Sequence, residues 1–156
     1  MIFVPMGLAV LGLIFTAIKA SWVKKQDPGN EKMQSISKAI KEGALAFLNA
    51  EYRLLAIFIM IAALALGTIS YFVATTHWMI IVAFVFGGFF SALAGNIGMR
   101  IATDSNSRTT QAARTSLPQA LKVSFGGGTV MGMGVAGLAV LGLSLFFFIF
   151  VKMFVT

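Results

Sequence analysis

The sequence predicts an all-α polytopic membrane protein with four transmembrane helices, the second of which extends into the cytoplasm. Three observations predict this class. Of the 156 residues, 58% are hydrophobic and 11% are charged, and this charged share is well below that of an ordinary soluble domain. The apolar residues form four runs, each long enough to cross a bilayer core of about 30 Å. The basic residues gather beside these runs, where they typically orient a membrane protein.

The first span is expected at about residues 2–23. Pro5 fits a first helical turn, where its missing N–H costs little. A cleaved signal peptide would carry positive charge before its apolar run, whereas Lys19, Lys24 and Lys25 come late in this segment or after it. We therefore expect a retained span.

The second helix is expected at residues 33–74, after a polar loop at 24–34 whose Asp-Pro-Gly-Asn sequence is typical of a turn. Its apolar membrane part is residues 54–74. At about 1.5 Å per residue such a helix is roughly 60 Å long, which exceeds one bilayer. Its first half is therefore expected to project from the membrane.

One stripe of this projecting half is apolar, because Ile36, Ile40, Ala44 and Phe47 recur at helical spacing. Glu51 lies on the same side, and two interpretations of it stay open. It is either a solvated carboxylate at the membrane surface or a carboxylate packed against another segment, which would need a positively charged partner. We expect the stripe to be a packing face.

The third span is expected at residues 78–103 and the fourth at 118–154. The fourth has a glycine-dense first half, in which Gly128 and Gly132 have the GxxxG spacing of close helix contacts. Asn96 in the third span is expected to form a hydrogen bond between helices. Between the two spans, the polar stretch 100–117 is expected to be a loop whose beginning is still helical.

The basic residues predict the orientation. Eleven of the twelve Lys and Arg lie on the side of the first and third connections, and the second connection has none. The positive-inside rule therefore places the loops at 24–34 and 100–117 in the cytoplasm and both ends of the segment outside. At this cytoplasmic face we expect structural polar contacts rather than chemistry, and we expect Glu51 to pair with an arginine of the later loop. The candidates for these contacts are Glu51, Arg100, Asp104, Asn106 and Arg108.

No reactive centre is evident in the residues themselves. There are no cysteines, one histidine and five acidic residues. A divalent cation needs several oxygen ligands, and no repeated acidic motif supplies them. Nucleic-acid binding is not expected, because the sequence has no basic helix face with interleaved aromatic residues.

Two stretches resemble a known family. MQSISKAIKEGALAFLNAEYR at residues 33–53 and GNIGMRIATDSNSRTTQAAR at residues 95–114 are similar to the N-terminal part of the membrane-embedded inorganic pyrophosphatases, the pyrophosphate-energised H⁺ or Na⁺ pumps. Asp104-Ser105 and Asn49-Ala50 depart from the pattern of that family.

The resemblance implies a larger assembly in the cell (inner) membrane. Members of the family are sixteen-span chains that dimerise, and they hydrolyse pyrophosphate with Mg²⁺, with K⁺ as a further candidate cofactor. The residues that hold these groups lie on later helices, so the resemblance assigns no catalytic, cofactor-binding or metal-binding residue here. This segment would be a fragment of the outer ring, a single membrane module that packs against the remaining helices of the pump, and would be inactive alone. The alternative is a stand-alone four-span accessory protein or small transporter.

Overall fold

The computed structural model describes residues 3–73 and 78–154. It contains the helices α1 (Phe3–Lys24), α2 (Glu31–Phe72), α3 (Met79–Ala113) and α4 (Leu117–Phe154). Each is long and apolar enough to cross a membrane, and no strand occurs in the described ranges. The expected class, an all-helical polytopic membrane protein with four spans, is confirmed.

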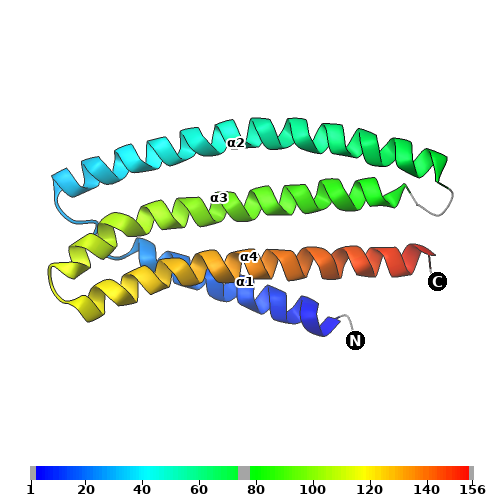
Figure 1. Ribbon diagram of the computed structural model, residues 1–156. Coiled ribbons are helices and arrows are strands. Elements are labelled where there is room, and N and C mark those ends of the chain that lie inside the picture. Colours follow the sequence, from blue (N-terminus) through cyan, green and yellow to red (C-terminus); the bar gives the residue numbers. More distant parts are fainter. Residues whose placement is uncertain (1–2, 74–77, 155–156) are drawn as a thin grey trace.

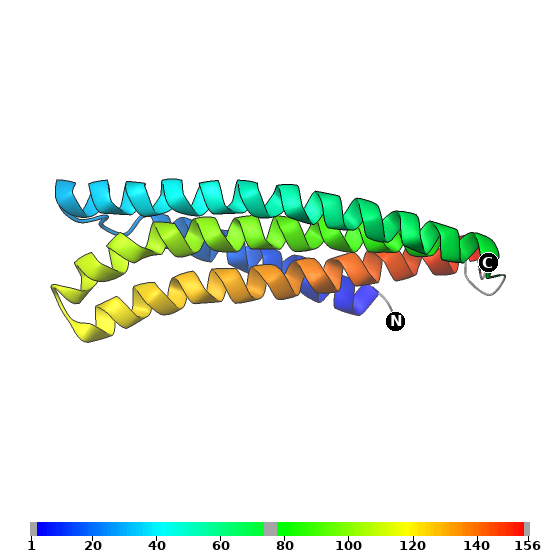
Figure 2. The same cartoon turned by 45° about the horizontal axis from the view of Figure 1, so that its top comes forward.

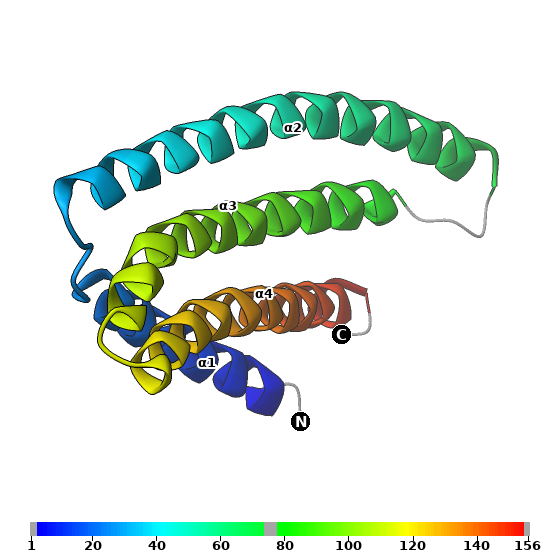
Figure 3. The same cartoon turned by 60° about the vertical axis from the view of Figure 1, so that its left-hand side comes forward.

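The helices form a curved row in the order α2, α3, α4 and α1 (Figures 1 and 3). Successive members of the row are antiparallel, and α2 contacts only α3 among the described helices. The connections at residues 25–30 and 114–116 lie together at one end of the row, which we call the loop end. The first and last described residues lie at the opposite end (Figures 1 and 2).

The polar stretch after the third span is helical, which corrects the expectation of a loop at 100–117. α3 continues to Ala113, and only residues 114–116 connect it to α4. The hydroxyl groups explain the difference. Thr103 donates a hydrogen bond to the Met99 carbonyl (2.9 Å), and Ser105 donates to that of Ala102 (2.9 Å). A residue whose hydroxyl group donates a hydrogen bond to a carbonyl of its own helix can remain in that helix.

The glycines of α4 that contact other helices are not those in the GxxxG spacing. A Cβ added at Gly126 would lie 3.0 Å from Trp22 of α1, and one added at Gly127 would lie 2.8 Å from Ser105 of α3. At Gly128 and Gly132 it would meet no described atom within 4 Å. α4 lies between α1 and α3, so successive residues of α4 face different helices. Gly128 and Gly132, the predicted pair, lie on a third side of α4.

The apolar stripe of α2 is not the face that packs within this chain. Ile36, Ile40 and Phe47 are all exposed, whereas Leu48 is buried. Tyr52 lies on the packed side, where its hydroxyl donates to the Ala92 carbonyl of α3 (2.8 Å). The covered face of α2 thus includes both the apolar Leu48 and the polar Tyr52, and the expected packing stripe is left open.

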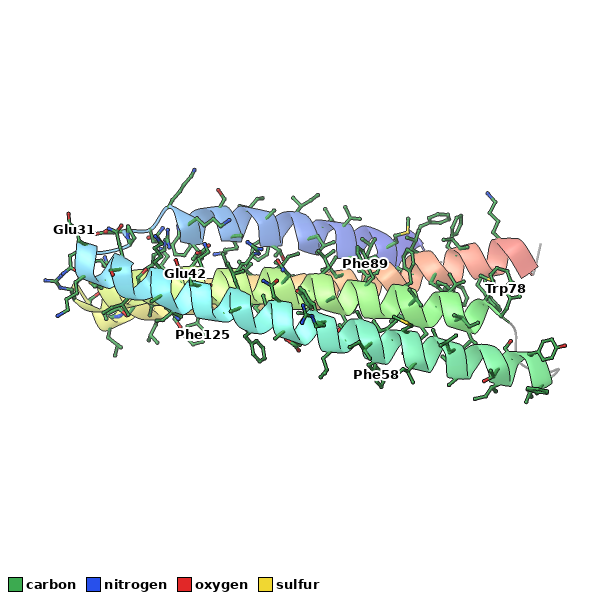
Figure 4. All side chains as sticks on the ribbon, turned by 90° about the horizontal axis from the view of Figure 1, so that it is seen from above. Glu31, Glu42, Phe58, Trp78, Phe89 and Phe125 are labelled. Carbon is green, nitrogen blue, oxygen red and sulfur yellow. The ribbon has the colours of Figure 1, made fainter. Side chains whose placement is uncertain are left out.

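The innermost core is small and lies among α1, α3 and α4. It centres on Val23, Ile101 and Val130, three buried residues contributed by three helices. Toward the opposite end, residues of α3 and α4 line an apolar groove of about 1040 Å³. The chain thus holds its helices together most firmly toward the loop end, where the polar side chains gather (Figure 4).

Candidate functional site

A salt bridge between α2 and α3 is the centre of the polar contacts at the loop end. The Lys41 ammonium lies 2.7 Å from Oδ1 of Asp104, and 17% of the Asp104 side chain is exposed. At this distance the contact is a charge-assisted hydrogen bond, the stronger class of such bonds. It secures α2, the outermost helix of the row, to its single neighbour.

Arg108 joins α3 to α1. Its Nε and Nη2 atoms donate to the carbonyl oxygen of Lys24, at 3.3 and 3.1 Å. Its Nη1 atom donates to the carbonyl of Asp104 one turn earlier in α3. Lys24 is the last residue of α1, so the guanidinium satisfies a terminal carbonyl and lies at the negative end of the helix dipole.

The connection between α1 and α2 is held by hydrogen bonds to Asp27 and by a cap at the start of α2. Gln111 of α3 donates from Nε2 to Oδ2 of Asp27 (2.9 Å), whose other carboxylate oxygen accepts from the Gly29 N–H (2.8 Å). Gly29 has a φ of +86°, a conformation that favours glycine. Asn30 then caps α2 by accepting from the Met33 N–H (2.9 Å).

We name this group of contacts the polar junction. It consists of side chains from α2, from the end of α3 and from the first connection, together with the last carbonyl of α1. Its residues are Lys24, Asp27, Lys41, Asp104, Arg108 and Gln111.

The junction contains two of the five residues proposed from sequence, Asp104 and Arg108. Arg100 instead donates from Nε to the Asn96 side chain four residues earlier (2.7 Å). The expected hydrogen bond from Asn96 to another helix is therefore replaced by one within α3. Asn106 is exposed, and its backbone carbonyl accepts from Thr110 (3.0 Å).

The predicted ion pair of Glu51 with an arginine does not form among the residues described here. Glu51 is exposed, and the register of the helices explains why. Because Lys41 faces Asp104 and Tyr52 faces Ala92, Glu51 lies about seven residues from the level of Arg100, or roughly 10 Å along the axis. The solvated interpretation of Glu51 agrees with this geometry.

Sequence reasoning missed four members of the junction, namely Asp27, Lys41, Gln111 and the carbonyl of Lys24. A helix-end carbonyl leaves no signal in the sequence. Lys41 could have been found, because an antiparallel arrangement of two long helices brings the polar start of one beside the polar end of the other. Its omission followed from assigning the packing face of α2 by hydrophobicity alone.

The chemistry of the junction is that of a structural tie. Its carboxylates accept hydrogen bonds from a lysine, an amide and a backbone N–H. In residues 3–73 and 78–154, no three His, Cys, Asp or Glu side chains come together as metal ligands.

Comparison with known proteins identifies the family. Residues 10–155 match the family described as inorganic H⁺ pyrophosphatase. The chain is 42% identical over 147 residues to the K⁺-insensitive pyrophosphate-energized proton pump 2 of Moorella thermoacetica, covering 94% of this chain and 21% of that protein. It is 40% identical over 147 residues to the K⁺-stimulated pyrophosphate-energized sodium pump of Thermotoga maritima, covering 93% of this chain and 19% of that protein.

These similarities extend along almost the whole chain, but the chain spans only about a fifth of the length of the curated relatives it matches. The resemblance inferred from its two polar stretches is thereby confirmed. The chain belongs to the inorganic H⁺ pyrophosphatase family of membrane proteins.

Proposed function

We propose that this chain is a scaffolding segment of an ion pump that hydrolyses pyrophosphate and moves H⁺ or Na⁺ across a membrane. The proposal rests on sequence similarity. Over more than nine tenths of the chain, about two fifths of the residues are identical to those of pyrophosphate-energized pumps. The polar junction supports the structural part of it, since Lys41, Arg108 and the Nε2 atom of Gln111 form contacts between α2 and α3, between α3 and α1, and between α3 and the first connection.

The loop end is proposed to face the cytoplasm, with both ends of the segment on the other side. The grouping of the connections at one end supports this orientation (Figure 1), because eleven of the twelve basic residues lie on the side of those connections. Basic residues beside spans are retained on the cytoplasmic side. The first half of α2 would then project into the cytoplasm.

The remaining helices of the pump are proposed to pack against two of the surfaces that this chain leaves open. The groove between α3 and α4 is lined by small residues such as Gly87, Ala139 and Gly142 beside aromatic ones, and small residues allow helices to approach closely. The open stripe of α2 is a second such surface. A homodimer of the whole pump, as the resemblance implied, is part of the same proposal.

Pyrophosphate and Mg²⁺ are proposed to bind outside this segment, since its described side chains do not gather as ligands. A requirement for K⁺ is left to the assay, because relatives at similar identity carry names of both kinds, K⁺-insensitive and K⁺-stimulated.

The test is a transport assay on inverted membrane vesicles that contain the complete product of the gene. Phosphate release from pyrophosphate is measured with and without Mg²⁺ and K⁺, while a pH-sensitive dye and ²²Na⁺ report ion uptake. We expect Mg²⁺-dependent hydrolysis coupled to uptake of one of the two ions. Inserted protein that neither hydrolyses pyrophosphate nor moves either ion would refute the proposal and favour the stand-alone accessory protein or transporter.

A further inference from the structure

Two lysines from different helices extend over one indole ring near the loop end. Nζ of Lys19 on α1 lies 5.4 Å from the ring centroid of Trp22, and Nζ of Lys122 on α4 lies 5.7 Å from the same ring. Lys19 also lies 5.8 Å from the ring of Phe15. An aromatic face attracts a cation at these distances, and Trp does so most strongly.

The indole is held in place by close packing against α4. A Cβ added at Gly126 would lie 3.0 Å from Cζ3 of Trp22, so the glycine admits the ring to the surface of α4. Val23, the next residue of α1, is fully buried. The ring therefore has a defined position, and the two ammonium groups are arranged around a rigid element rather than on free side chains.

Among the described residues, neither Lys19 nor Lys122 forms a salt bridge with a carboxylate. The salt bridge that forms there joins Lys41 and Asp104. The indole N–H of Trp22 likewise has no recorded acceptor among the described residues, although its backbone carbonyl accepts from Gln26. Two cations that share one ring repel each other, and an anion bound between them would offset that repulsion. The cluster thus presents two positive charges and a hydrogen-bond donor.

The surroundings of the cluster are apolar and exposed. Ile18, four residues before Trp22 on α1, is 62% exposed, and Phe125, three residues after Lys122 on α4, is 70% exposed. Apolar side chains beside basic ones near the end of a span are typical of the level where lipid headgroups meet acyl chains.

We propose that Lys19, Trp22 and Lys122 bind the phosphate-bearing headgroup of an anionic phospholipid in the leaflet at the loop end. The two ammonium groups and the indole N–H contact the phosphate, and the exposed apolar side chains contact the acyl chains. The partner is a lipid rather than free phosphate, because the cluster lies beside apolar surface at the end of a span. The site depends on membrane insertion and not on the pump activity proposed above.

Lipid retention by the purified product of the complete gene tests the proposal. The protein is incubated in detergent with phosphatidylglycerol or phosphatidylcholine, and bound lipid is measured by native mass spectrometry. The double variant Lys19→Gln/Lys122→Gln is expected to lose affinity for phosphatidylglycerol by about tenfold to thirtyfold, the combined effect of two lysines at an anionic surface. Binding of phosphatidylcholine is expected to be unchanged.

The matched control is Lys32→Gln/Lys38→Gln, which removes the same charge from exposed positions of α2. It is expected to retain phosphatidylglycerol, as is Lys19→Arg/Lys122→Arg, which keeps the charge. An equal loss of affinity for phosphatidylglycerol in the Lys19/Lys122 and Lys32/Lys38 glutamine variants would contradict the proposed site, because it would show a general effect of charge. Displacement of the lipid by millimolar inorganic phosphate would overturn the assignment of its partner as a lipid. Hydrolysis of pyrophosphate, measured separately, bears on the proposed pump and not on this site.

Discussion

The close contact between Gly127 of α4 and Ser105 of α3 makes Gly127→Ala the most informative substitution in the chain. The added Cβ would lie 2.8 Å from Oγ and 3.0 Å from Cβ of Ser105. Rotation of the hydroxyl relieves the first contact, at the expense of its 2.9 Å hydrogen bond to Ala102. It does not relieve the second, because the position of a Cβ is fixed by its backbone.

The two helices must therefore separate by a few tenths of an ångström at this point to restore an ordinary contact. Overpacking of this kind costs about 1–3 kcal/mol. We expect Gly127→Ala to lower the free energy of unfolding by about 1–2 kcal/mol relative to Gly128→Ala, where the added Cβ meets nothing within 4 Å. The better helix propensity of alanine, up to about 1 kcal/mol, applies to both variants and cancels in the comparison.

Unfolding of each variant in detergent micelles, followed by circular dichroism, measures the difference. Ser105→Gly in the Gly127→Ala background removes both clashing atoms and is expected to restore part of the loss. Equal stability of Gly127→Ala and Gly128→Ala would refute the assignment of the α3-facing side of α4.

Four further substitutions and one labelling experiment test other parts of the fold. In a double-mutant cycle, Lys41→Met and Asp104→Asn are expected to show a coupling of about 1 kcal/mol in unfolding free energy, reduced by solvent screening of the partly exposed lysine. Tyr52→Phe is expected to cost about 1 kcal/mol by removing the hydrogen bond from its hydroxyl to the Ala92 carbonyl, which joins α2 to α3. Asn30→Ala is expected to cost about 1 kcal/mol through loss of the α2 cap. Thr115→Cys, in a chain without native cysteines, is expected to react with an impermeant thiol reagent only from the cytoplasmic side.

Each of these expectations has a contrary result. Additive effects of Lys41→Met and Asp104→Asn would show that the pair contributes no coupling energy. Full stability of Tyr52→Phe or of Asn30→Ala would mean that water replaces the missing bond. Labelling of Thr115→Cys from the external side alone would reverse the proposed orientation.

The fold class was predictable because hydrophobic length is a strong signal in membrane proteins. Four apolar runs gave four helices, and the long second helix followed from the absence of a breaker between Ser35 and Phe72. The end of α3 was not predictable in the same way. Hydroxyl side chains such as Thr103 and Ser105 suggest a loop by composition, and only the structure reveals that they bond to their own helix.

The faces of the helices were less predictable than their existence. Hydrophobicity marks a core face when water is the alternative, but the alternative for a membrane helix is lipid, which is equally apolar. Ile36 and Phe47, on the half of α2 proposed to project from the membrane, are exposed within this chain and leave their stripe open to another segment, whereas the polar pair of Lys41 and Asp104 lies on the face that contacts α3. In such a chain, polar contacts between helices and close contacts at glycines mark the packed faces better than apolar stripes do.

The scaffolding role is tested most directly by the turnover of pyrophosphate per folded molecule when the junction is broken. The complete gene product carrying Lys41→Met and Asp104→Asn is inserted into vesicles, and its hydrolysis rate and thermal half-life are compared with those of the unaltered protein. We expect a shorter half-life with unchanged kcat and KM. A loss of kcat of about a hundredfold or more at unchanged half-life, as expected for removal of a general acid or base, would show that these residues act in catalysis.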